Sequence, residues 1–344
     1  AMESQFEHSP PSWWLRAIAD LDVVCPGLCG ALLRASPHRQ HVAATVLAHR
    51  RGDELMNGPE LVSPLVTSRI NVLLVDLIGS NPSGLIGCLR RMSAKIEPPA
   101  FYRKLAAIYS DPEQKDVARA FRHVTGLNST MLNAAIGSPR WLLDARAFRV
   151  LANARQRDDL VAAVELIREI CPTATSDGLE TSLRKATARD AIPGFIQTWL
   201  SKSRFPDAPI PLHNDIVHIA TASDLHRVAT EFENCIDTFR LDILCGREAF
   251  YSCDTQGMRV IGRIGRDDSS QAWQFLGVHG RRNVMPPHGA NTWVRQQFGK
   301  IGIHPEIQRA DRPEKWRPIE RLLDPWFYDI DDVEDSVVDD LCLV

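Results

Sequence analysis

Between residues 36 and 204, apolar positions recur at helical spacing and are separated by short polar links. In the segment DDLVAAVELIREIC, Leu160, Ala163, Val164 and Ile167 lie on one helical face, and Pro172 follows the end; this predicts one amphipathic helix. Proline tolerates the first helical position, so helices are also expected at SPH, GPE, NPS, DPE and SPR, at residues 36, 58, 81, 111 and 138. The pattern predicts a large all-helical domain over 1–205, either a bundle or an irregular helical repeat.

The end of this domain is predicted from two features. The segment SDGLETSLRKATARDAIPGFIQTWLSKSRF has helical spacing that is broken near Pro193. Its second half places apolar side chains on one face at residues 195, 196, 199 and 200. The next segment, FPDAPIPLHND, carries three prolines between 206 and 211, which is typical of a stiff, extended connection. We therefore expect a domain boundary after residue 205.

Beyond this connection the periodicity changes. The segment TASDLHRVATEFENC predicts a helix capped by Thr221 or Ser223, and three β-like runs follow at 248–253, 258–265 and 272–278. Short polar links between the runs favour antiparallel hairpins. A last amphipathic helix at about 289–300 is expected to cover one face of the sheet. The sequence thus predicts an α+β chain, in which residues 206–321 form a small antiparallel three-stranded sheet flanked by helices.

Charge is distributed unevenly along the chain. The formal net charge is −3, but residues 322–344 contain eight acidic residues and no lysine or arginine, which leaves +5 on residues 1–321. In this acidic tail the carboxylates alternate with apolar side chains, a composition that can dock on a complementary surface. One hypothesis is that the tail competes with nucleic acid or another anionic partner for arginines 259, 263, 281 and 282. The alternative is a solvated tail.

Composition and hydropathy indicate the cellular setting. The eight cysteines are scattered, so reduced and mostly buried thiols are expected rather than a disulfide scaffold. The most apolar run, residues 69–79, is too short and too charged to span a bilayer. The first residues lack a basic segment followed by an apolar core, so no signal peptide is expected. These features predict a cytoplasmic protein that does not contact membranes.

Several features of residues 213–300 resemble one known family. Asn234, Cys235 and Ile236 end a helix, Phe239 follows three residues later, and Gly246 precedes a strand. A later strand runs into a glycine, two basic residues, an asparagine and prolines in HGRRNVMPP, residues 279–287. This order resembles the PcfJ-like family of conjugative plasmids and other mobile elements. The resemblance covers about a quarter of the chain, and it implies a link to mobile elements but no established chemistry. The chain departs from the family pattern in lacking a glycine upstream of Cys235.

Cys235, His279 and Asn283 are the candidate catalytic residues. A thiol nucleophile needs a base within reach and a group that orients the base. His279 and Asn283 lie in a glycine-containing turn at the end of the third predicted strand, and they could supply these two roles. The alternative, which we expect for Cys235 because unreactive buried cysteines are common, is that it is a small, buried hydrophobic residue and that HGRRN is only a tight turn.

Arginines and aromatic residues alternate on the predicted sheet, and this pattern favours contacts with nucleic acid. Two-residue alternation places Arg259 and Arg263 on one face of the second strand, and aromatic residues follow on the next strand. Such a face can bind phosphates and stack bases. The alternative is a solvated face with ordinary core aromatics. The candidate nucleic-acid-binding residues are Arg259, Arg263, Arg266, Arg281, Arg282, Trp273 and Phe275.

No metal site or cofactor is predicted. Cys25, Cys29, His38 and His41 have spacings that do not match a Cys2His2 zinc finger. The histidines at 213, 218 and 226 are interpreted as one linker histidine and two histidines on helix faces. The chain also lacks a Walker loop, a GxGxxG sequence after a strand, and an HExxH sequence.

Three interpretations of function remain. The first is a cytoplasmic accessory protein whose helical domain contacts proteins and whose α+β module binds nucleic acid or another partner. The second is a cysteine-dependent hydrolase or transferase that uses Cys235 and His279. The third is a protein-only interaction or immunity factor that acts through the helical domain.

Overall fold

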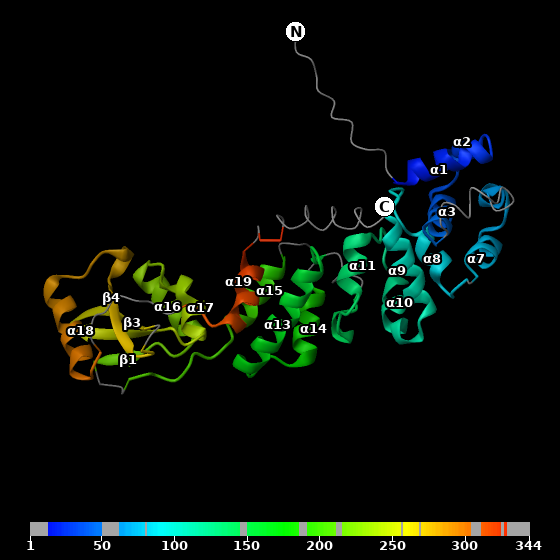
Figure 1. Cartoon of the computed structure of the whole chain (residues 1–344). Helices are drawn as coiled ribbons and strands as arrows, with labels where there is room; N and C mark the ends of the chain where they lie inside the picture. Colours follow the sequence, from blue (N-terminus) through cyan, green and yellow to red (C-terminus); the bar gives the residue numbers. More distant parts are fainter. Residues whose placement is uncertain are drawn as a thin grey trace, which may run out of the picture. The chain divides into compact units, whose positions relative to one another are not determined.

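The computed structural model describes residues 13–49, 62–79, 81–144, 150–185, 191–210, 215–255, 257–267, 270–303, 311–324 and 327–328. The chain divides into two compact units, residues 1–155 and 156–344. The described part of the first unit is helical, and the second unit combines helices with one antiparallel sheet (Figure 1). The predicted α+β class is confirmed.

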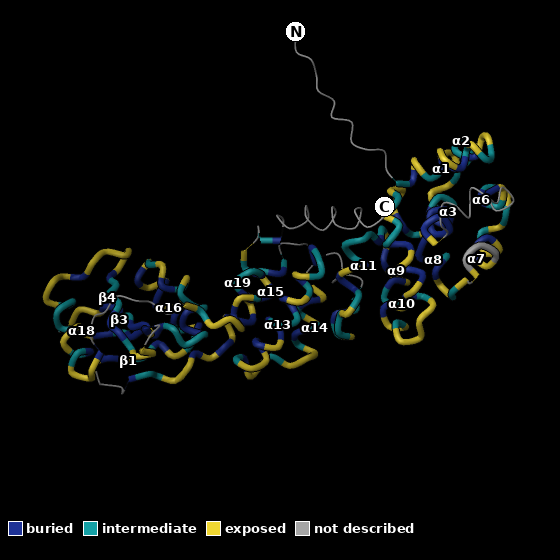
Figure 2. The backbone as a smooth tube through the Cα atoms, viewed as in Figure 1, coloured by how far each residue is buried: buried dark blue, intermediate teal, exposed yellow. Residues whose placement is uncertain are grey.

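The first unit is built from short helices packed around one central helix. Its described elements are α1 (Trp13–Val24), α2 (Leu28–Arg34), α3 (Pro37–His49), α6 (Pro64–Thr67), α7 (Ile70–Ile78), α8 (Leu85–Arg90), α9 (Pro99–Ser110), η1 (Pro112–Gln114), α10 (Lys115–Phe121), α11 (Ser129–Ala135) and η2 (Arg140–Leu142). Helix α3 is buried from His41 through Ala48, as Figure 2 shows, and it contacts α2, α7, α8 and α9. In a repeat array each helix would contact only its neighbours, so the unit resembles an irregular bundle.

Some of the helix starts predicted at prolines agree with the structure. Helix α3 begins at Pro37, and η1 begins at Pro112, where the Asp111 carboxylate accepts a hydrogen bond from the Glu113 amide at 2.8 Å. The start predicted at NPS is wrong, because α8 begins only at Leu85, after Gly84 in the left-handed conformation. The SPR start leads only to η2. The GPE start lies outside the described residues.

The helices of the second unit include those that the apolar patterns predicted, together with short helices that were not predicted. They are α13 (Ala154–Ile170), α14 (Ser176–Arg184), α15 (Ala191–Leu200), α16 (Ala222–Phe232), η3 (Ile236–Phe239), α17 (Arg240–Leu244), η4 (Arg281–Asn283), α18 (His288–Lys300), η5 (Glu314–Trp316) and α19 (Arg317–Leu323). The apolar faces predicted for α13 and α15 are buried. The Thr221 hydroxyl caps α16 by accepting from the Asp224 amide at 3.0 Å. These predictions are confirmed.

Within the described residues, the sheet has four strands in the order β1-β2-β3-β4, and all neighbours are antiparallel. The strands are β1 (Ile216–His218), β2 (Glu248–Thr255), β3 (Met258–Arg266) and β4 (Trp273–His279). The last three strands were predicted, but the expected three-stranded sheet is wrong by one strand. Strand β1 has only three residues, too few to show alternation, and it forms by pairing with β2 in the register Val217↔Ser252.

Helices cover both faces of the sheet. On one face, Val294 and Phe298 of α18 pack into a core with Tyr251, Cys253 and Phe275. The opposite face is covered by α16, η3 and α17, where the Phe239 and Phe250 rings lie 5.7 Å apart. Figure 1 shows α18 and the α16–α17 pair on opposite sides of the sheet. The prediction that the last helix covers one face is confirmed.

After the sheet, the chain returns to the helices that precede it. Helix α19 packs on α15, and its Arg321 donates to the carboxylate of buried Asp159 on α13. The Tyr328 hydroxyl donates to the same carboxylate at 2.5 Å. Arg312 donates to Asp242 of α17 at 2.9 Å. The packing of α19 on these helices places α13–α15 in one compact unit with the sheet. The domain boundaries predicted at residues 205 and 321 stay predictions. The acidic residues 329–344 lie outside the described residues.

Candidate functional site

The two predicted basic strand residues have different environments. Arg263 donates both Nε and Nη2 to Glu248, at 2.8 and 2.7 Å, and its guanidinium lies 3.9 Å from the centre of the Phe239 ring. The Glu248 side chain is 0 % exposed and that of Arg263 is 15 % exposed. The charge of Arg263 is therefore neutralised beneath η3. Arg259 is more open, and it donates to Ser252 at 2.7 Å and to Glu231 at 2.7 and 2.9 Å.

The aromatic residues predicted to stack bases belong to the core. Phe275 is 4 % exposed, and its ring lies 5.7 Å from that of Phe298. Trp273 is half-buried against the same core, with the exposed Arg266 guanidinium 5.1 Å from its ring centre. Since helices cover both sheet faces, Phe275 has no open surface on which a base could stack. Arg259 and Arg263 do share one sheet face, as predicted.

A basic turn follows β4 and lies against the end of α16. Arg281 and Arg282 of η4 both donate to the carboxylate of Glu233, which follows α16, and the Arg282 Nε to Glu233 Oε2 distance is 2.7 Å. Hydrogen bonds from Arg282 and Arg281 lower the pKa of the Glu233 carboxyl below its usual value. Both arginines are exposed. One carboxylate against two guanidinium groups leaves the turn with a positive charge.

Backbone strain is concentrated in this turn. Glu233, Arg282 and Asn283 have φ angles of 51°, 57° and 58°, and left-handed conformations are costly for residues other than glycine. A Cβ atom on Gly280 would lie 2.4 Å from the Val284 carbonyl oxygen. Glycine is therefore required where the chain turns back on itself, and the contacts of the turn must hold its unfavourable conformations.

Cys235 is exposed at the start of η3, so the expectation that this thiol is buried is wrong. Its backbone amide and its Sγ atom each lie 3.4 Å from Asn283 Oδ1. The apolar residue of this segment is the adjacent Ile236, which is fully buried. The structure thus brings together two of the three predicted catalytic residues, Cys235 and Asn283.

His279 lies at the end of β4, opposite Ile261 of β3. Its ring is 6.2 Å from the ring of Phe250, on the sheet face that α16 and α17 cover. Burial and the nearby Arg263 charge lower the pKa of His279, which favours the neutral imidazole. A neutral imidazole can act as a base, but the hydrogen bond that the structure gives Cys235 Sγ is to Asn283. The described geometry therefore contains a thiol–amide contact and no thiol–imidazole contact.

An open groove lies beside the basic turn, with a volume of about 440 Å³. Its wall includes Val284 and Met285, which are 65 % and 76 % exposed, and Met258 at the start of β3. Arg259 and Arg281 also line it. We call this feature the basic groove; it is lined by Glu231, Phe232, Met258, Arg259, Val260, Gly280, Arg281, Val284, Met285, Pro286 and Pro287. The sequence reasoning missed its apolar part, although VMPP places two apolar residues directly after the basic turn.

The histidines and cysteines that were considered as metal ligands lie in other environments. The His41 ring contacts the Tyr102 hydroxyl at 2.8 Å and the Ser93 carbonyl at 2.6 Å. His226 lies on α16 and contacts Asp237 at 3.2 Å, whereas His218 on β1 packs against Tyr251. Among the described residues, no three histidine, cysteine or acidic side chains are grouped to hold a metal ion. Within the same residues, no helix has the length and apolar character needed to cross a bilayer.

Comparisons with known proteins give no relative from which a function could be transferred. No family model, curated protein or solved structure matches the chain. The resemblance of residues 213–300 to the PcfJ-like family stays a prediction based on the residues around Cys235 and in the turn at 279–287.

Proposed function

We propose that the protein is an accessory protein that binds a partner protein, and that the basic groove is the surface that binds it. The observation that carries this proposal is the exposure of Val284 and Met285 beside Arg281 on the strained turn. Contiguous exposed apolar side chains with a polar rim are typical of interaction sites. A cytoplasmic location remains part of the proposal.

The chemistry of the groove indicates which partner segment it would accept. Met258 and Met285 offer flexible, polarisable side chains, which adapt to varied apolar partners. Arg281 and Arg282 share the single Glu233 carboxylate. This rim therefore keeps a positive charge and can receive a further anionic group. A segment that alternates acidic and apolar residues would satisfy both features, with apolar side chains in the groove and carboxylates at the arginines.

Nucleic acid is the less favoured partner for this surface. Base stacking needs exposed aromatic rings, whereas Phe275 is buried and Trp273 packs against the core. Phosphate contacts would rely on Arg281, Arg282 and Arg266, which are exposed. Such contacts would give binding that is sensitive to salt but insensitive to the apolar residues of the groove.

Fluorescence anisotropy with short labelled peptides tests the proposal. Peptides that alternate aspartate with leucine or valine should bind, and peptides with asparagine in place of aspartate should bind at least about tenfold more weakly. Met285→Ser should weaken binding of the acidic peptide, whereas Val23→Ser, a matched change at an exposed apolar residue of the first unit, should not. Peptide binding that ignores Met285→Ser would contradict the proposal. A labelled single-stranded oligonucleotide that binds through Arg281 and Arg282, independently of Met285, would favour nucleic acid.

A second candidate function is a cysteine-dependent hydrolase or transferase. The exposed Cys235 thiol, with its contact to Asn283 on the strained turn, is the observation that supports it. The test is the rate at which iodoacetamide alkylates Cys235 in the native protein. If His279 is the base for Cys235, His279→Gln should slow the alkylation of Cys235 at least about tenfold. A thiol that is merely exposed should react at the same rate in both proteins.

A further inference from the structure

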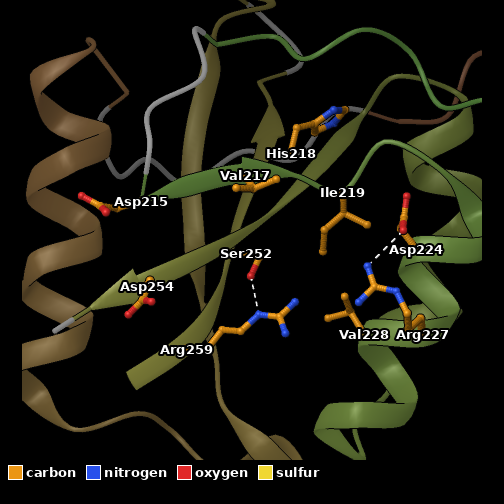
Figure 3. A pocket seen from close by; sticks show the side chains of 10 residues that line it. All are labelled: Asp215, Val217, His218, Ile219, Asp224, Arg227, Val228, Ser252, Asp254 and Arg259. Atoms are coloured by element: carbon orange, nitrogen blue, oxygen red, sulfur yellow. Dashed lines mark hydrogen bonds and ion pairs between the residues drawn. The ribbon is translucent and has the colours of Figure 1, made fainter. Parts of the chain in front are cut away.

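A second cavity, which we call the edge cavity, lies where α16 meets the β1 edge of the sheet. Its volume is about 420 Å³, within the range of small-molecule sites. Its floor comes from β1, β2 and β3, through Val217, Ser252 and Arg259, and α16 contributes Arg227 and Val228 (Figure 3). Val217 is 57 % exposed although it lies on the sheet face that α16 covers farther from the edge. The edge strand β1 therefore extends beyond α16, and the cavity occupies the part of the sheet that the helix leaves uncovered.

Charged side chains line both ends of this cavity, and Asp224 lines it beside Arg227. Arg227 comes from α16, whereas Asp215 and Asp254 come from the segment before β1 and from the end of β2. Figure 3 shows Asp215 and Asp254 toward one end, Arg227 with its ion-pair partner Asp224 toward the other, and Arg259 between them. The apolar side chains of Val217, Ile219 and Val228 lie along the cavity. A ligand that matches this lining carries a negative group, an apolar body and a positive group.

The arginines of the edge cavity retain donors for an anionic ligand. Arg227 donates Nη2 to Asp224 at 3.0 Å, and its side chain is 62 % exposed. Arg259 uses Nε for Ser252 and Nη1 for Glu231, and the described contacts do not use its Nη2. A guanidinium has five N–H groups. The two side chains can therefore donate to a carboxylate without breaking the ion pairs that the structure shows.

Asp254 has a matching capacity for a cation. Its Oδ1 accepts from the Gly257 amide at 3.1 Å in the β2–β3 hairpin, which orients the carboxylate. The side chain is exposed and lines the cavity with its second oxygen uncommitted among the described contacts. A protonated amine can therefore pair with Asp254 in a charge-assisted hydrogen bond, which is stronger than a neutral one.

We propose that the edge cavity binds a small zwitterion, with its carboxylate at Arg227 and Arg259 and its ammonium group at Asp254. Val217, Ile219 and Val228 contact the apolar body between the two charges. A short peptide with free ends and aliphatic side chains has this chemistry and a size that fits the cavity. This site is separate from the basic groove, because Arg227 and Asp254 line only the edge cavity, whereas Arg259 lines both.

Calorimetric titration of the full chain with three forms of one dipeptide tests the assignment. The probes are Ala-Val, its N-acetylated form and its C-terminal amide, so that each capped form lacks one charge. Ala-Val should bind at least about tenfold more tightly than either capped form. Arg227→Gln should remove the preference over the amide, and Asp254→Asn should remove the preference over the acetylated form. Met285→Ser, in the basic groove, should change none of these affinities.

Each contrary outcome overturns the proposal. Three probes that bind equally, or none that bind, would exclude a zwitterion site for aliphatic peptides. A preference for the free carboxylate without one for the free amine would replace the zwitterion by a simple anion. Discrimination that survives both Arg227→Gln and Asp254→Asn would place the binding elsewhere. Because both side chains are exposed, neither variant is expected to impair folding, and circular dichroism provides the check.

Discussion

The ion pairs of Glu248 and Glu231 predict that the same substitution has very different effects at two sites on one sheet. Glu248 is 0 % exposed and binds Arg263 through both carboxylate oxygens. Glu231 also forms a glutamate–arginine ion pair, with Arg259, but the Glu231 side chain is 47 % exposed and that of Arg259 is 38 % exposed. Glutamine preserves the size of glutamate and removes only the negative charge. We therefore compare Glu248→Gln with Glu231→Gln.

The difference in burial sets the expected magnitudes. Removing one partner of a buried ion pair leaves an unpaired charge, and this costs about 3–5 kcal/mol. An exposed pair contributes about 0–1 kcal/mol, because water solvates the charge that remains. Contact with Phe239, 3.9 Å from the guanidinium, adds to the desolvation of Arg263. Replacing both Arg263 and Glu248 by methionine removes both charges, so it should restore most of the loss caused by Glu248→Gln.

Native-state hydrogen exchange of β2 and β3 is the appropriate assay, since it reports on the sheet separately from the first unit. Glu248→Gln should reduce protection of these amides by more than about a hundredfold, whereas Glu231→Gln should reduce it by less than about tenfold. Equal losses in the two variants would show that burial of the pair does not determine its energetic role. A double methionine variant as unstable as Glu248→Gln would refute the unpaired-charge explanation.

Three further predictions concern pH, the chain connection and the acidic tail. Burial lowers the pKa of His41, which contacts Tyr102 and Ser93, so the first unit should lose stability as pH falls below about 6.5; a hydrogen-exchange pH series that shows no such loss, or one unchanged in His41→Asn, would contradict this. Limited proteolysis should cut first between about residues 203 and 216, and a first cut inside 36–200 would show that the predicted boundary is misplaced. Deletion of residues 329–344 should strengthen binding of the acidic peptides and of single-stranded nucleic acid at low salt, with a gain that shrinks as salt rises; equal binding by the two proteins would refute competition by the tail.

Elements with a strong local pattern could be predicted from the sequence, whereas elements that depend on a distant partner could not. The spacing of apolar residues in α13, α15 and α16, and the short β-like runs between polar links at β2 and β3, correctly predicted these elements. Strand β1 has no such local signal, because its three residues become a strand only by pairing with Ser252 and its neighbours on β2. Helix α8 begins after Gly84, not at Pro82, because the left-handed glycine allows the turn into the helix.

The candidate site was predicted only in part, for a related physical reason. The sequence placed Cys235 at the end of a helix and Asn283 in the turn after a strand, and their contact follows from the fold. Exposure of Cys235 could not be predicted, because the buried position is taken by the adjacent Ile236. The burial of Glu248 also has no signal in the local sequence. A buried carboxylate needs a partner, and here the partner is Arg263 from the next strand. The basic groove needs the ends of α16 and β4 to meet, which only the tertiary structure specifies.

The return of α19 to α15 has a consequence for the order of events during synthesis on the ribosome. Helix α15 ends at Leu200, but α19 begins only at Arg317, so the sheet module is made between the two halves of one helical core. Ile319 and Leu322 of α19 are buried in this helical core. Asp159 gains its ion-pair partner, Arg321, only when α19 has been made. The sheet module can fold while it emerges, because its strands are close in sequence. Helices α13–α15 therefore complete their core only after α19 has been made, and until then their apolar face is exposed and prone to aggregation.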